Sequence, residues 1–166
     1  MVREGDALVC DLGPARSAAE CLEIIGEYAR RNPGEPWIVG GGWRLDLFPG
    51  GTPTREALDR VVPDRPVILR SADRHSSWVN SRALEIAGVT ADTPDPADGR
   101  MERDADGAPA GTLHEGAILL VQSHSPAPTV AALHRGLLVA QEFLYSLGVI
   151  GWQDALLRIQ DNGVDS

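Results

Sequence analysis

At 166 residues, 43% of them hydrophobic, the chain is long enough for one ordinary domain with a substantial core. The net charge of −9 argues against a nucleic-acid partner, because phosphate binding needs a basic face. No apolar run approaches the length of a membrane span and no charged-then-apolar leader opens the chain, so we expect a cytoplasmic protein with no membrane association.

The first half of the chain alternates predicted helices and strands. Ser17 and Glu20 have the spacing of a capping box, and the apolar residues that follow suit one buried helical face. The glycines at 40–42 indicate close approach of the backbone to another element or a pocket. In order, we predict a helix over 17–31, a strand over 37–40, a helix over 53–61 with Thr52 as its N-cap, and a strand over 67–70.

The second half continues with shorter elements and one long helix. We predict a short helix capped by Asn80 or Ser81 and ending before Gly88, a hairpin of 100–103 with 110–113, a helix over 115–122, a linker over 123–128, a helix over 129–147, and a buried strand over 149–153. Asp154 would lie at the carboxyl end of that last strand. The alternation of strands and helices predicts an α/β fold with some parallel pairing.

Local spacing predicts no metal site. The four histidines form no His-x-His pair, and Ile118 stands where a zinc-binding helix that begins at His114 would need its second histidine. The segment 104–107 lacks the closing glutamate of a calcium loop and is better explained as a β-turn. Cys10 and Cys21 have no redox spacing, which suits free thiols in the cytosol. All 15 basic residues are Arg, which together with 18 Gly and 12 Pro suggests a GC-rich bacterial genome.

One segment has the composition of a functional site. Residues 73–81, DRHSSWVNS, follow a predicted buried strand, and residues at the carboxyl end of a strand often line a site. The alternative is a helix entry with one aromatic anchor. The residues themselves do not decide between the two.

Five segments, in order, resemble the amidohydrolase subgroup that includes N-substituted formamide deformylases. They are PWIVGGGW at 36–43, TREAL with VPDRPV at 54–67, DRHSSWVNSRAL at 73–84, GR with GTLHE within 99–115, and LGVIGWQDA at 147–155. Together they cover nearly the whole chain.

The resemblance implies part of a (β/α) barrel of a metal-dependent hydrolase with an inserted α/β subdomain. We expect a barrel-associated helix at 1–34, the inserted subdomain at 35–113, and a barrel segment with a long helix and the second barrel strand at 114–166. Complete members bind one or two divalent ions, usually zinc, and hydrolyse amide or related C–N bonds of small molecules. The resemblance places Trp43, His75, Trp78, Asn80, Glu115 and Asp154 near the substrate pocket, without assigning a catalytic role to any of them.

Two departures from the family pattern qualify that expectation. No residue of the chain matches the family's metal ligands, so we expect no metal on this chain and no hydrolysis by it alone. Arg74 stands where the family usually has Gly, which predicts a strained loop or a charge directed at the pocket.

Three hypotheses follow. The chain is a fragment of a hydrolase that associates with itself or with a complementing chain, as one half of a split enzyme would. Alternatively, it is a small-molecule binding module that reuses the pocket around Trp43, His75 and Trp78. The third hypothesis is an active enzyme with a metal site built from His75 and acidic residues.

Overall fold

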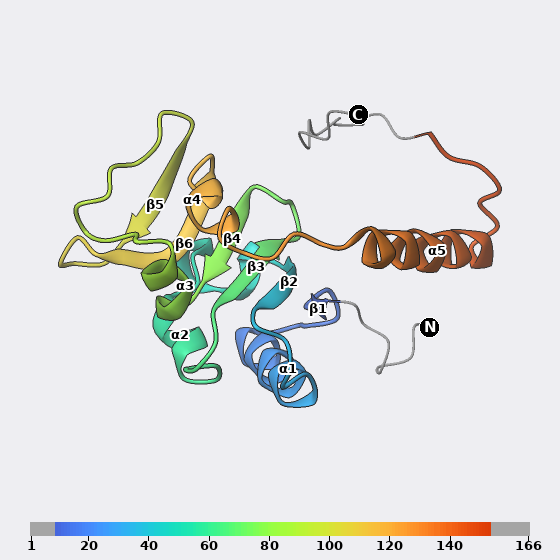
Figure 1. Cartoon of the computed structure of the whole chain (residues 1–166), viewed down its shortest axis with the longest axis horizontal. Helices are drawn as coiled ribbons and strands as arrows, with labels where there is room; N and C mark the ends of the chain where they lie inside the picture. The colour runs from blue at the N-terminus through green and yellow to red at the C-terminus, as the bar shows by residue number, and fades with distance from the viewer. Residues whose placement is uncertain (1–8, 154–166) are drawn as a thin grey trace. The chain divides into compact units, whose positions relative to one another are not determined.

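A six-stranded mixed sheet forms the centre of the computed structural model, which describes residues 9–153 (Figure 1). The strand order is β1-β2-β3-β4-β6-β5. The strands are β1 Cys10–Asp11, β2 Ile38–Trp43, β3 Val67–Ser71, β4 Ser76–Val79, β5 Gly99–Arg103 and β6 Pro109–Glu115. β1, β2 and β3 pair in parallel, and the pairs from β3 to β5 are antiparallel. The predicted α/β class with partial parallel pairing is confirmed.

The glycines of β2 allow its neighbours to approach closely. A Cβ on Gly40 would overlap the backbone oxygen of Cys10 in β1, and one on Gly41 would overlap the backbone oxygen of Arg70 in β3. The prediction that these glycines serve backbone approach is confirmed. The strand extends beyond the predicted end at Gly40 to Trp43, because the glycines are part of the ladder.

β4 was not predicted. Its four residues, SSWV, are all buried and pair with β3 on one side and β6 on the other. The strand was missed because two of its four residues are serines, whereas strand prediction relies on β-branched and aromatic residues. The segment that sequence analysis treated as a loop or helix entry is therefore a turn followed by a central strand.

Helices cover both faces of the sheet, and the sheet separates the core into two clusters. On one face, α1 (Ala18–Arg31) and α2 (Arg55–Asp59) pack with Trp43, Leu69 and Trp78. On the other face, α3 (Ser81–Ile86) and α4 (Ile118–Gln122) pack with Ile68, Val79 and Leu113. This alternation along β3 and β4 follows from the two-residue period of a strand.

Helix ends were predicted with mixed success. Ser17 caps α1 by accepting the Glu20 amide (3.1 Å), and Asn80 rather than Ser81 caps α3. The predicted cap at Thr52 is wrong, since α2 begins after Thr54. The backbone stays extended there because the Pro53 carbonyl accepts the Thr112 hydroxyl (2.6 Å) and the Thr54 carbonyl accepts the Trp78 indole N–H (2.8 Å).

The remaining elements complete two units. Two short 3-10 helices, η1 Leu45–Leu47 and η2 Pro49–Gly51, follow β2. Within the described residues, 9–127 form one compact unit and 128–153 another, which contains α5 (Val130–Ser146), capped by Thr129 as predicted. The three-part division at 34 and 113 stays a prediction.

The predicted strand over 149–153 is wrong: these residues have no strand conformation, and a strand needs a pairing partner. Asp154 lies outside the described residues. Among the helices of residues 9–153, none is both long and apolar enough to cross a bilayer.

Candidate functional site

Two predicted pocket residues, His75 and Glu115, meet at one edge of the sheet. His75 lies in the turn between β3 and β4, and Glu115 is the last residue of β6. Because Ser76 pairs with His114, the residues just beyond this pair are neighbours, and the Glu115 amide donates to the His75 carbonyl (3.0 Å). The His75 Nδ1 atom is 2.7 Å from Glu115 Oε1. This edge also holds the carboxyl ends of β2 and β3, where open α/β sheets bind ligands.

The pair is open to solvent, with 68% of the His75 side chain and 57% of the Glu115 side chain exposed. A carboxylate only accepts hydrogen bonds, so the Nδ1 atom of the imidazole carries the hydrogen between them. In the neutral ring this leaves Nε2 with a lone pair to accept a hydrogen bond or a proton. The arrangement can therefore orient a bound molecule or exchange a proton with it.

The turn that carries His75 is held by its own polar groups. The Ser71 hydroxyl lies 2.6 Å from Asp73 Oδ1, which also accepts the His75 amide (3.1 Å). These two hydrogen bonds, the hydroxyl first, lower the pKa of the Asp73 carboxyl below its ordinary value. The turn thus fixes the backbone from which the imidazole projects.

Two non-glycine residues at this site have left-handed backbone conformations. Arg74 has φ 68°, and Glu115 has φ 49°. Such conformations are uncommon for residues with a Cβ and concentrate at functional sites. The strained loop predicted at Arg74 is observed. A left-handed φ explains why glycine is usual at the matching position of the family.

Three other predicted pocket residues lie inside the fold. Trp43, Trp78 and Asn80 are fully buried. The Trp43 indole donates to the Leu69 carbonyl (2.8 Å), and both tryptophans pack edge-on against Phe48. Their place in the substrate pocket stays a prediction, and their polar atoms are used within the fold.

A partly buried series of hydrogen-bonded side chains, which sequence analysis did not find, crosses three strands. Ser76 Oγ is 2.9 Å from His114 Nδ1, and His114 Nε2 is 2.9 Å from Glu102 Oε1. Glu102 lies where the β5–β6 register shifts, and such irregularities re-aim side chains. Ser76 is only 2% exposed, so the series cross-links β4, β6 and β5 rather than presenting a reactive hydroxyl. In the sequence, the only sign of these hydrogen bonds was that His114 follows the polar residue Thr112 by two positions, so that both lie on one face of the strand.

The described residues do not fit a metal ion. Within residues 9–153, no three His, Cys, Asp or Glu side chains converge as a metal site requires. His75 and Glu115 form a pair without a third such ligand among these residues.

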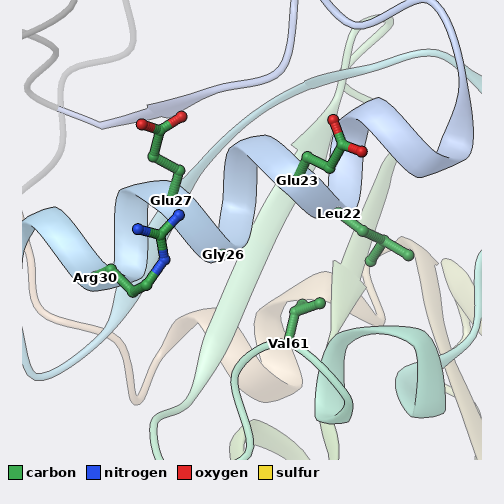
Figure 2. A pocket seen from close by; sticks show the side chains of 6 residues that line it. All are labelled: Leu22, Glu23, Gly26, Glu27, Arg30 and Val61. Carbon is green, nitrogen blue, oxygen red and sulfur yellow. The ribbon is translucent and has the colours of Figure 1, made fainter.

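A shallow hollow beside α1 is a second candidate surface. Figure 2 shows Leu22 and Gly26 on the side of α1 nearer Val61, with Glu23 and Glu27 pointing away from the hollow. Arg30 completes the lining, and Glu27 forms an ion pair with Arg31 (2.5 Å). The hollow contains none of the predicted pocket residues and offers no convergent chemistry.

Comparison with known proteins establishes the family. Residues 4–162 match the family described as "Amidohydrolase family". The chain belongs to this family. It is 35% identical over 147 residues to "Putative amidohydrolase YtcJ" of Bacillus subtilis (strain 168), covering 87% of this chain and 27% of that protein. It is 37% identical over 121 residues to "N-substituted formamide deformylase" of Arthrobacter pascens, covering 72% and 22% respectively. This amidohydrolase chain thus spans about a quarter of the length of its curated relatives.

Solved structures agree with the family assignment. The amidohydrolase chain is similar to uncharacterized metal-dependent hydrolases from Pyrococcus horikoshii and Pyrococcus furiosus, each with a TM-score of 0.52. The identities are 26% and 28%, and each match covers 85% of this chain and 26% of the other. The predicted fragment of a metal-dependent hydrolase fold is confirmed.

Proposed function

We propose that this amidohydrolase chain forms the substrate-orienting part of an enzyme that hydrolyses amide or other non-peptide C–N bonds. The observation that carries the proposal is the His75–Glu115 pair, with its 2.7 Å contact and its exposed imidazole. Both residues belong to segments that resemble family signatures, and the relative from Arthrobacter pascens is named for deformylation of N-substituted formamides.

The chemistry of the pair suits an amide ligand. With Nδ1–H directed at Glu115, the Nε2 atom can accept an amide N–H. When the ring is protonated, the same atom can donate to the carbonyl oxygen instead. Glu115 fixes which nitrogen faces the ligand, as carboxylates do for histidines in hydrolytic sites. His75 is thus proposed to position the scissile group, and Glu115 to act through His75.

We propose that the zinc ions of the complete enzyme are held by residues outside 9–153, and that the chain alone does not hydrolyse amides. The lack of convergent ligands among the described residues supports this proposal. Free, buried Cys10 and Cys21 support a cytoplasmic location, because a reducing compartment keeps such thiols unpaired.

We also propose that the chain associates with a second copy of itself or with a complementing chain. None of the residues of α5 is buried, although apolar positions recur along it every three or four residues. A helix with this pattern is usually stabilised by packing its apolar stripe. Light scattering should show self-association of the purified chain, and a stable monomer with a cooperative melt would contradict the proposal.

The experiment that tests the central proposal is a histidine-detected NMR titration of the whole chain with N-formylglycinamide, a neutral N-substituted formamide. We expect the His75 ring signals to move and those of His124, an exposed histidine in the same unit, to stay fixed. His75→Asn should weaken binding at least about threefold, while His124→Asn should leave it unchanged. Equal binding by the two variants would refute the assignment.

Zinc analysis and an amide-hydrolysis assay of the same preparation test the second part of the proposal. We expect well under one zinc ion per chain and no formate release from N-formylglycinamide. Retention of about one ion per chain with turnover would place the metal site on this chain.

A further inference from the structure

Two arginines stand beside the His75–Glu115 pair. Arg70, in β3, donates from one guanidinium nitrogen to the Arg74 carbonyl (3.0 Å) and from the other to Gln122 Oε1 (2.9 Å). Both acceptors are neutral. Within the part of the chain that the structure describes, no carboxylate oxygen lies within 4.0 Å of the guanidinium group of Arg70 or of Arg74. Eight other arginines have such a partner.

The surroundings of Arg70 and Arg74 combine partial burial, like charge and backbone strain. Burial, and then the nearby charge of Arg74, lower the pKa of Arg70, while the charge of Glu115 acts in the opposite direction without cancelling them. Arg74 also keeps a left-handed φ of 68°, which a glycine would adopt without strain. Strain and like-charge proximity that persist together at one turn indicate a functional constraint.

A third observation lies on the same face of the sheet. Ser77 pairs directly with Arg70 across β3 and β4, so the two side chains leave the sheet on the same side. The Ser77 hydroxyl is fully buried and is without a hydrogen-bond partner among the described residues. An unpartnered buried hydroxyl next to a guanidinium whose acceptors are both neutral marks this corner as polar but incompletely satisfied.

We propose that Arg70 and Arg74, next to His75, bind a carboxylate on the substrate, so that the substrate class is an amide that also carries a negative charge. This inference rests on the proposed function. A planar guanidinium suits a carboxylate, and two of them compensate the repulsion that an anion meets from a chain of net charge −9.

The neighbouring Glu115 favours a ligand group with a single negative charge. Glu115, exposed beside the cluster, repels a dianion more strongly than a monoanion. A carboxylate is therefore the group to which the site is assigned, rather than a doubly charged phosphate.

The test compares N-formylglycine with the neutral N-formylglycinamide and with inorganic phosphate, by NMR titration of the whole chain at low salt. We expect N-formylglycine to bind at least about threefold more tightly than its amide, and this preference to shrink with added salt. Equal affinity for the two formyl compounds would overturn the inference, as would tighter binding of phosphate than of N-formylglycine.

Variants distinguish the effect of the arginine charges on binding from an effect on folding. Arg74→Gly removes the cation and relieves the left-handed backbone, so we expect the preference for the anion to fall while the melting temperature holds or rises. Arg70→Gln should also reduce the preference. Arg60→Gln, which removes an exposed arginine elsewhere, should retain it. A preference that survives both site substitutions would overturn the inference.

The same titrations distinguish failure of the carboxylate site from failure of the proposed function on which it rests. If both formyl compounds bind equally and His75→Asn weakens both, the orienting pair stands and the carboxylate site fails. If neither compound binds, the proposed function fails with it.

Discussion

Replacing Asn80 by Ala should strongly destabilise the sheet-containing unit without acting on ligand binding directly. The amide side chain joins three segments through four hydrogen bonds. Its oxygen accepts the Val67 amide (2.9 Å) and the Ala83 amide (3.0 Å), and its nitrogen donates to the carbonyls of Val62 (3.1 Å) and Arg65 (2.8 Å). The substitution therefore removes an N-cap and three contacts that fix the entry to β3.

The magnitude follows from what the alanine leaves unpaired. Loss of the cap of α3 costs ~1 kcal/mol. The buried Val67 N–H is left without its acceptor, which costs roughly 1–3 kcal/mol, and two carbonyls lose a donor at smaller cost. We expect a total of about 3–4 kcal/mol, a large share of the ~5–15 kcal/mol that usually stabilises a domain.

Urea unfolding followed by tryptophan fluorescence measures this, because Trp43 and Trp78 are fully buried. The matched control is Asn32→Ala, which removes a single side-chain bond to the Tyr28 carbonyl (2.9 Å) and should cost about 0.5–1 kcal/mol. If Asn80→Ala costs no more than this control, Asn80 is not the structural link described here. Its predicted role in the substrate pocket would then regain support.

Three further predictions concern β2, a buried thiol and an indole. Gly40→Ala should cost about 3 kcal/mol because its Cβ would overlap the backbone oxygen of Cys10, whereas Gly34→Ala, with nothing within 4 Å, should stay within ~0.5 kcal/mol in thermal melts. Burial raises the pKa of the Cys10 thiol from 9.0 to about 12, so its stabilising effect is complete below pH 9.0 and is lost as pH rises through about 12. Melting temperatures should therefore fall less between pH 9 and 11 in Cys10→Ala than in the parent chain, and parallel pH profiles would contradict this. Trp78→Phe should cost about 1–2 kcal/mol in urea unfolding, since it leaves the Thr54 carbonyl without its donor, and a neutral effect would exclude that hydrogen bond as a stabilising contact.

Local signals in the sequence predicted the elements whose causes are local. The capping hydroxyl of Ser17 and the apolar spacing after it define α1, and a helix formed at the predicted position. The hairpin of β5 and β6 follows from a turn in which Asp104 Oδ1 accepts the amides of Asp106 and Ala108. Each of these features depends on residues a few positions apart, which a single sequence displays.

Elements that depend on distant partners were not predictable in the same way. β4 has weak strand propensity in its two serines, and its conformation comes from pairing with β3 and β6. The start of α2 was misplaced because side chains from Trp78 and Thr112 hold the backbone at 53–54 extended. Tertiary contacts overrode local preference in both places.

The candidate site shows the same distinction at the level of single residues. A compact run such as DRHSSWVNS suggests one cluster of side chains, but a strand sends successive residues to opposite faces. Trp78 therefore enters the core beside Trp43, and Val79 enters the other core cluster, while His75, ahead of the strand, stays exposed. Its partner Glu115 lies 40 residues away and arrives through the pairing of β4 with β6. Only the pairing of these two strands shows that one histidine and one glutamate, and not the tryptophans of the signature, face the solvent together.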